Sequence, residues 1–99
     1  MKPDKLQSMI GLAKKAGKLV SGEFASEASV KKSEAHLVIV ATDASDNTKK
    51  LFNDKCTFYN VPIIEVLTKE ELGHCIGDEY RAVAAVLDKG LADAIIKIK

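Results

Sequence analysis

The sequence predicts an α/β fold, a three-layer α/β/α sandwich in which helices cover both faces of a four-stranded sheet. Short apolar runs of strand length alternate with segments whose apolar residues recur at helical spacing. Two of the runs, residues 36–41 and 82–87, are apolar almost throughout, as strands covered on both faces are. This alternation of strands and helices favours a largely parallel sheet.

The first two helices are predicted from their end signals and apolar spacing. Pro3 lies near the start of the first, where proline is tolerated, and Gly17 stops it. Residues 18–20 are a short strand candidate. The second helix is expected from about Gly22 to Lys32. The apolar residues of the first helix are Leu6, Met9, Ile10 and Ala13; the second has Ser21 as a plausible N-cap and few apolar residues, namely Phe24, Ala25, Ala28 and Val30.

The middle of the chain is predicted to form a strand, a helix and a second strand. Residues 36–41 form the first of these strands. The third helix is expected to begin near Asp43 or Ser45, and Pro62 opens the strand of residues 63–66. The apolar stripe of the third helix consists of Leu51, Phe52, Cys56 and Tyr59.

The last third of the chain begins with a capping box, in which Thr68 is followed three residues later by Glu71. The short fourth helix behind it ends at Gly77, and residues 82–87 form the fourth strand. Asp88 is positioned to cap a final helix. The inward residues are Leu72, Cys75 and Ile76 in the fourth helix, and Leu91, Ala94, Ile95 and Ile98 in the last.

The bulk composition predicts one cytoplasmic domain covering residues 1–99. The chain is 46% hydrophobic and 29% charged, which is ordinary for a globular protein. Neither a signal peptide nor an apolar run of membrane-spanning length is seen. Cys56 and Cys75 are interpreted as reduced core residues. Residues 1–50 carry a net charge of +3 and residues 51–99 one of −2. This asymmetry fits either a basic face for phosphate or a chance distribution on a solvated surface.

Enzyme signatures are missing from the sequence. Glycine-rich nucleotide loops and the nucleophile elbow do not occur. His74 and Cys75 are neighbours and point about 100° apart on a helix, so they do not form a catalytic pair. Their spacing from the other histidine and cysteine does not suit structural zinc. We therefore expect no catalysis, no cofactor and no metal, with His74 either satisfied by a hydrogen bond or facing solvent, and Cys75 in the core.

Basic and polar residues cluster near helix ends. Gly22 and Ser45 stand where helices follow strands, so backbone N–H groups there are positioned for phosphate. Tyr80 beside Arg81 is a candidate platform for a splayed base, or else the edge of the core. The basic clusters, for which a solvated helix face is the alternative interpretation, are Lys14-Lys15 with Lys18, Lys31-Lys32, and Lys49-Lys50.

Four segments carry a family resemblance. Residues 10–23 (IGLAKKAGKLVSGE) look like the opening of the YlxQ-type bacterial proteins, in the kink-turn RNA-binding ribosomal protein superfamily, the L-seven-Ae and L-thirty-e group. Residues 41–50 (ATDASDNTKK), 54–62 (DKCTFYNVP) and 72–77 (LGHCIG) also resemble it. The resemblance extends over nearly the whole chain, and the four segments occur in the family's order.

The resemblance implies an α/β/α sandwich with a four-stranded mixed sheet, and binding of structured RNA, typically kink-turns, near ribosomes. In kink-turn binders a Gly-x-Asn-Glu-x-x-Lys motif opens the second helix and reads sheared G·A pairs. An ungapped alignment puts its glycine on Gly22. The Asn, Glu and Lys positions are then occupied by Phe24, Ala25 and Ala28.

The function expected from the sequence is RNA binding by a monomeric, ribosome-associated accessory protein, with ribosomal or other kink-turn RNA as partner and no membrane association. A protein–protein interaction module of the same fold is the first alternative, and a small hydrolase is a distant third. The residues expected to bind RNA are Lys14, Lys15, Lys18, Ser21, Gly22, Glu23, Lys31, Lys32, Asp43, Asn47, Lys50, Tyr80 and Arg81.

Overall fold

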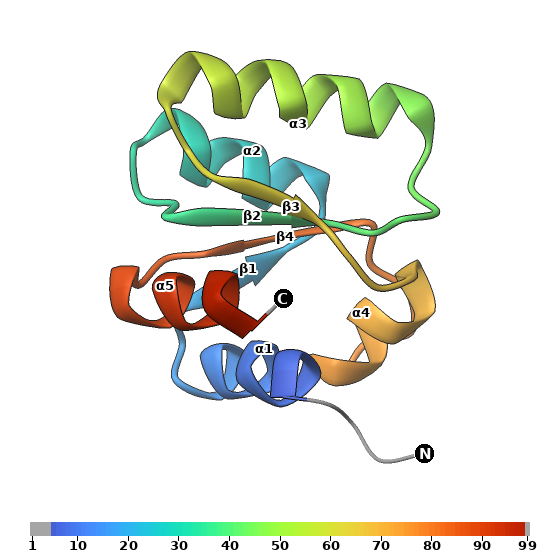
Figure 1. Ribbon diagram of the computed structural model, residues 1–99. Coiled ribbons are helices and arrows are strands. Elements are labelled where there is room, and N and C mark those ends of the chain that lie inside the picture. The colour runs from blue at the N-terminus through green and yellow to red at the C-terminus, as the bar shows by residue number, and fades with distance from the viewer. Residues whose placement is uncertain (1–4, 99) are drawn as a thin grey trace.

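A computed structural model describes residues 5–98 of the chain, so Pro3 lies outside the described residues. Helices and strands alternate along the chain, as the sequence predicts (Figure 1). The elements are α1 (Lys5–Lys15), β1 (Leu19–Ser21), α2 (Glu23–Lys31), β2 (Leu37–Val40), α3 (Asp46–Tyr59), β3 (Ile63–Glu65), α4 (Lys69–Cys75), β4 (Val83–Val86) and α5 (Lys89–Ile98).

The sheet is mixed, with the strand order β1-β4-β2-β3. Only β2 and β3 pair in parallel, whereas β4 lies between β1 and β2 and is antiparallel to both. The expectation of a largely parallel sheet was therefore wrong, and the mixed sheet implied by the resemblance is confirmed. The reason is that the chain enters β4 at the end of the sheet where β1 and β2 finish, so β4 runs in the opposite direction.

Helices cover both faces of this sheet, as Figure 1 shows, with α2 and α3 on one side and α1, α4 and α5 on the other. Side chains alternate between the faces along each strand. Leu37 and Ile39 of β2 pack toward α1, α4 and α5, while Val38 and Val40 pack toward α2 and α3. Phe52 is fully buried in the second of these layers. The three-layer sandwich is thus confirmed.

Several predicted helix ends are confirmed by their hydrogen bonds. Thr68 and Glu71 form the reciprocal capping box, and Asp88 accepts a hydrogen bond from the N–H of Leu91 at 2.9 Å. Ser45, rather than Asp43, is the N-cap of α3. These interactions lie within one turn of chain, which is why residue types alone predict them.

The buried face of α2 differs from the expectation. Ser26, Ser29 and Val30 are buried, whereas Phe24 is 88% exposed. Ala25 and Ala28 are half-buried. The two serines are small enough to let α2 approach its neighbours closely, and Ser29 satisfies its hydroxyl by donating to the Ser26 carbonyl at 2.7 Å. Helix α2 therefore buries small polar residues and leaves its one aromatic ring in solvent.

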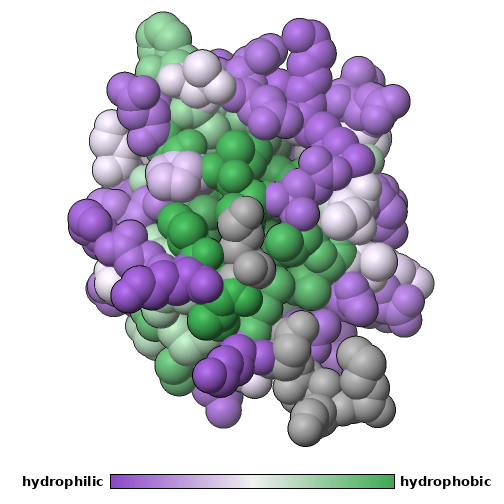
Figure 2. All heavy atoms as spheres, in the orientation of Figure 1, coloured by the Kyte–Doolittle hydropathy of each residue, from purple (hydrophilic) through white to green (hydrophobic). Residues whose placement is uncertain are grey.

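Apolar side chains gather in the middle of the face shown in Figure 2, around α5, with hydrophilic side chains surrounding them. Half-buried residues that pack against the adjoining core include Leu67, Leu91 and Ile96. Across the described part of the chain, no helix combines the length and the apolar character needed to cross a membrane.

Candidate nucleic-acid interface

Three segments meet at the end of the sheet where β1 and β2 finish and β4 begins. The N–H of Gly22, before α2, donates to the carbonyl of Val83 at 2.9 Å, and the N–H of Ala41 donates to that of Ala82 at 2.8 Å. The starts of α2 and α3 and the loop from α4 to β4 are thereby brought together. A fourth segment, residues 65–69 between β3 and α4, adjoins them through the loop before α3. We call this surface the junction face; it consists of residues 21–24, 41–50, 65–69 and 78–82.

The start of α2 leaves backbone donors uncapped. Gly22 is the N-cap, with φ 92° and ψ 156°, a conformation that essentially only glycine adopts, and no side chain caps the helix. Ser21, expected as the cap, lies instead in β1, so that expectation was wrong. The first intrahelical hydrogen bond runs from the N–H of Ser26 to the Gly22 carbonyl at 3.0 Å. The first turn of α2 therefore offers N–H groups to an anionic acceptor.

The start of α3 is tied directly to the start of α2. The hydroxyl of Ser45 accepts from the N–H of Thr48 at 3.1 Å. The hydroxyl of Thr48 in turn donates to Oε2 of Glu23 at 2.8 Å. Glu23 thus holds the two helix starts in register. Asn47, in the first turn of α3, is exposed.

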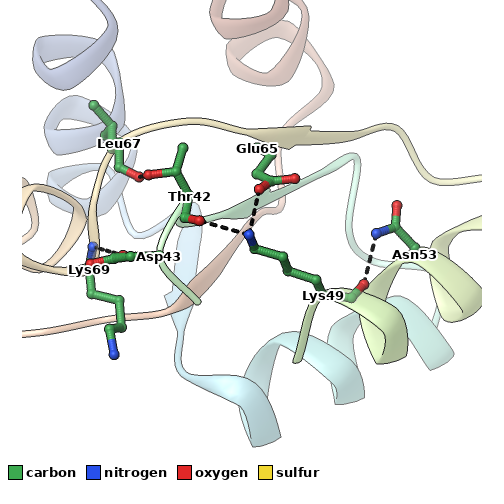
Figure 3. Close-up of polar contacts among 7 residues, drawn as sticks. All are labelled: Thr42, Asp43, Lys49, Asn53, Glu65, Leu67 and Lys69. Carbon is green, nitrogen blue, oxygen red and sulfur yellow. Dashed lines mark hydrogen bonds and ion pairs between the residues drawn. The ribbon is translucent and has the colours of Figure 1, made fainter. Parts of the chain in front are cut away.

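The loop before α3 is fastened to the chain around α4 (Figure 3). The hydroxyl of Thr42 donates to the carbonyl of Leu67 at 2.9 Å, and the carboxylate of Asp43 accepts from the N–H of Lys69 at 2.7 Å. The ammonium of Lys49 donates to the carbonyl of Thr42 at 2.7 Å and lies 2.9 Å from a carboxylate oxygen of Glu65. Asp43 is thus occupied as a structural acceptor.

The loop between α4 and β4 presents the guanidinium of Arg81, which is fixed by contacts within the fold, beside the exposed ring of Tyr80. Nε of Arg81 donates to the hydroxyl of Ser21 at 3.1 Å and lies 3.4 Å from a carboxylate oxygen of Asp78. A Cβ on Gly73 would lie 2.6 Å from the Glu79 carbonyl, so this loop packs closely on α4. Tyr80 is 60% exposed, which excludes the alternative that it forms the edge of the core.

The residues expected to bind RNA fall at two opposite ends of the sheet. The second end is where β1 and β2 begin and β4 finishes, and we call it the lysine end. Lys31 there pairs with Glu27 at 3.4 Å, and on the junction face Lys50 pairs with Asp54 at 3.4 Å. The junction face holds Ser21, Gly22, Glu23, Asp43, Asn47, Lys50, Tyr80 and Arg81, and the lysine end holds Lys14, Lys15, Lys18, Lys31 and Lys32.

Sequence reasoning missed the long-range contacts of the junction face. Thr42, Thr48 and Lys49 carry much of its hydrogen bonding, yet their partners lie far away along the chain. The only signal for them is their position directly after a buried strand, where polar residues begin. Their contribution is to hold the loop from β2 to α3 in one geometry.

The cysteines and histidines form no metal site within the described part of the chain. Among residues 5–98, no cluster of three or more histidine, cysteine or acidic side chains is placed to hold a metal ion. Burial raises the pKa of the Cys56 thiol from 9.0 to about 11, so it stays protonated at neutral pH. Cys75 is half-buried rather than a core residue, which corrects that expectation, and His74 faces solvent as predicted.

Comparisons with known proteins show the family to which this chain belongs. Residues 4–96 match the family described as ribosomal protein L7Ae/L30e/S12e/Gadd45. The RNA-binding protein YlxQ of Bacillus subtilis (strain 168) is 42% identical over 90 residues, covering 91% of this chain and 90% of that protein. The YlxQ protein of Enterococcus faecium is 42% identical over 88 residues, covering 89% and 84%. These matches confirm the resemblance seen in the sequence.

Solved structures show the same fold. A Bacillus halodurans protein of unknown function superimposes with a TM-score of 0.94 at 34% identity, covering 97% of each chain. The 15.5 kDa RNA-binding protein of Giardia lamblia superimposes with a TM-score of 0.80 at 20% identity, covering 99% of this chain and 88% of that one. At that identity the second likeness concerns the fold alone.

Proposed function

We propose, from the premise that this chain belongs to the ribosomal protein L7Ae/L30e/S12e/Gadd45 family, that it binds structured RNA through the junction face. Two relatives that match most of its length are named as RNA-binding proteins. The observation that carries the proposal is the set of open N–H groups at the start of α2, placed beside exposed polar and aromatic side chains from two other segments.

Each part of the junction face has a distinct task in this proposal. The open amides of α2 receive a phosphate, since a helix start favours negative charge. Asn47 reaches a base edge or a ribose, because its amide both donates and accepts. Tyr80 stacks on an unpaired base. Gly22 permits close approach of the RNA backbone because it has no side chain.

The proposal also includes the kind of RNA that is bound and the cellular role of the protein. Kink-turn-like RNA, ribosomal or other, is the ligand, and the protein acts without catalysis as a monomeric ribosome-associated accessory in the cytoplasm. Because Phe24, Ala25 and Ala28 have no groups to read sheared G·A pairs, recognition rests on the shape of the RNA backbone and on unpaired bases. This predicts modest preference for a kink-turn over other bent RNAs.

Salt dependence tests which end of the sheet binds RNA. Of the four basic side chains on the junction face, Lys49 is held within the fold by both Glu65 and the Thr42 carbonyl. The three that remain to contact RNA are the more exposed Lys50 and Arg81, together with Lys69. Binding there predicts a slope of log affinity against log salt of no more than about −3. RNA that also covered the five lysines of the lysine end would give about −7.

Paired variants complete the experiment. Asn47→Ala with Tyr80→Ala changes the junction face, and Lys31→Ala with Lys32→Ala is the matched control at the lysine end. We expect the first pair to weaken binding to a kink-turn RNA at least about tenfold, about 1.4 kcal/mol, and the control to change it less than about threefold. Equal affinity of all three proteins, or no binding of kink-turn RNA and plain duplex at low salt, would refute the proposal.

A further inference from the structure

A groove of about 560 Å³ lies between α1 and the end of α4, in the helical layer opposite α2 and α3. Figure 1 shows these two helices side by side. The groove is lined on the α1 side by Gly11 and Leu12 and on the α4 side by Ile76. Four residues of the segment 10–23, which carries the family resemblance, line it, and they take no part in the junction face; these are Gly11, Leu12, Lys14 and Lys15.

The two helices that border the groove approach closely at a glycine. A Cβ on Gly11 would lie 2.9 Å from the carbonyl oxygen of Cys75, so any larger residue would push the helices apart. Leu12, one position further, does not enter the core and is 51% exposed. Ile76 is 6% exposed and forms part of the apolar floor. An exposed leucine over an apolar floor is a surface suited to another apolar side chain.

The charged side chains that line the groove have one sign. They are Lys14 and Lys15, and no carboxylate lines it. Both lysines are exposed, and within residues 5–98 neither is within ion-pair distance of an acidic side chain. Some other lysines, such as Lys31 and Lys50, have a carboxylate partner, whereas Lys18 and Lys32 have none among the described residues. The rim of the groove therefore offers unneutralised positive charge beside an apolar floor.

We propose that this groove docks an acidic, amphipathic peptide segment of a partner protein. An apolar side chain of the peptide contacts Leu12 and the floor, and its flanking carboxylates pair with Lys14 and Lys15. RNA fits the surface less well, because no phenylalanine, tyrosine or tryptophan lines it to stack on bases, and an exposed leucine contributes nothing to phosphate binding. Charge complementarity of this kind chooses among partners and speeds their association. The protein would thus hold RNA at one surface and a protein at another.

The probe is a synthetic peptide of about 12 residues, with leucines at helical i and i+4 spacing and glutamates on either side. Its control replaces each glutamate by lysine. Titration into isotope-labelled protein, followed by amide chemical shifts, locates the binding site. We expect the largest shifts at Gly11, Leu12 and Ile76, and none with the lysine peptide.

Two groove variants and one matched control separate specific docking from general attraction. Lys14→Glu with Lys15→Glu should weaken peptide binding at least about tenfold. Leu12→Ser, which keeps every charge, should weaken it about fivefold. Lys31→Glu with Lys32→Glu makes the same charge change at α2 and should leave affinity within about twofold. All of the substituted side chains are exposed, and thermal unfolding confirms that each variant is folded.

Other outcomes would overturn the proposal. Absence of shifts at about 1 mM peptide, where even weak binding is detected, removes the docking site. Equal weakening by both lysine pairs shows attraction by net charge alone. If Lys14→Glu with Lys15→Glu lowers affinity for RNA more than the control pair does, these lysines belong to the RNA surface. We expect the groove variants to bind RNA unchanged, so the experiments test peptide docking and RNA binding independently.

Discussion

The first turn of α2 provides a direct test of what limits RNA specificity. Phe24, Ala25 and Ala28 stand where kink-turn readers, by the resemblance described above, carry Asn, Glu and Lys. We predict that the unmodified protein discriminates poorly between a kink-turn and a variant whose sheared G·A pairs are replaced. The triple substitution Phe24→Asn, Ala25→Glu and Ala28→Lys should create discrimination.

The structure indicates that the triple variant folds. Phe24 is 88% exposed, so its ring covers only about 25 Å² of apolar surface and contributes about 0.6 kcal/mol. Ala25 and Ala28 are half-buried and leave room for side chains that extend toward solvent. A glutamate in the first turn also interacts favourably with the helix dipole, by about 0.3–1 kcal/mol. We therefore expect the free energy of unfolding to change by less than about 1 kcal/mol.

The gain in discrimination follows from the cost of unpaired polar groups. Each donor or acceptor of a G·A pair left without a partner in a dry interface costs about 1–3 kcal/mol. Supplying even one partner should give the triple variant a preference of about tenfold, or 1.4 kcal/mol. The assay is a titration of both proteins with both RNAs, with circular dichroism to confirm folding. A preference of tenfold or more in the unmodified protein, or a folded variant without preference, would refute this reasoning.

Three further predictions concern single positions. Gly22→Ala should lower the free energy of unfolding by about 1–3 kcal/mol, measured by thermal denaturation. The cause is backbone strain alone, because the added methyl group meets no atom within 4 Å. Unchanged stability would contradict the strained geometry. Tyr80→Ala should cost about 1–3 kcal/mol of RNA affinity with little change in melting temperature, and the reverse pattern would mean a structural role. Burial raises the pKa of Cys56 to about 11, so the folded protein keeps a proton that the unfolded chain loses above pH 9, and stability should fall from about pH 9 to 11. A Cys56→Ala variant should lack that part of the slope, and identical slopes would exclude this linkage.

Local signals predicted much of the fold. The capping box of Thr68 and Glu71, the cap at Ser45 and the stop at Gly17 depend on residues within one turn, so residue types suffice. The direction of a strand in the sheet, by contrast, is not set by residues close to it in the sequence. The position of β4 between β1 and β2 depends on pairing between segments more than forty residues apart, and alternation of helices and strands is compatible with both outcomes.

The candidate site was predicted in part for the same reason. Gly22 and Asn47 follow buried strands, and that position alone brings them to one end of the sheet. One of the two interpretations of the charge distribution was a single basic face, but Lys31 lies at the far end of α2, about 12 Å along the helix from Glu23. The bond from Arg81 to Ser21 crosses 60 positions of sequence. Such contacts depend on the complete tertiary structure, and neither segment's sequence predicts them by itself.

The strand order also bears on aggregation. The two apolar strands, β2 and β4, are central, whereas the edges of the sheet are β1 and β3, of three residues each. Short edges offer few backbone groups to another chain, and Pro62 and the ion pair of Lys49 with Glu65 further disfavour pairing at β3. The segments best suited to amyloid-like stacking, Leu37–Val40 and Val83–Val86, are thus covered on both faces and both edges. Their self-association should require global unfolding, so conditions that open only a terminus or a loop should leave the protein soluble.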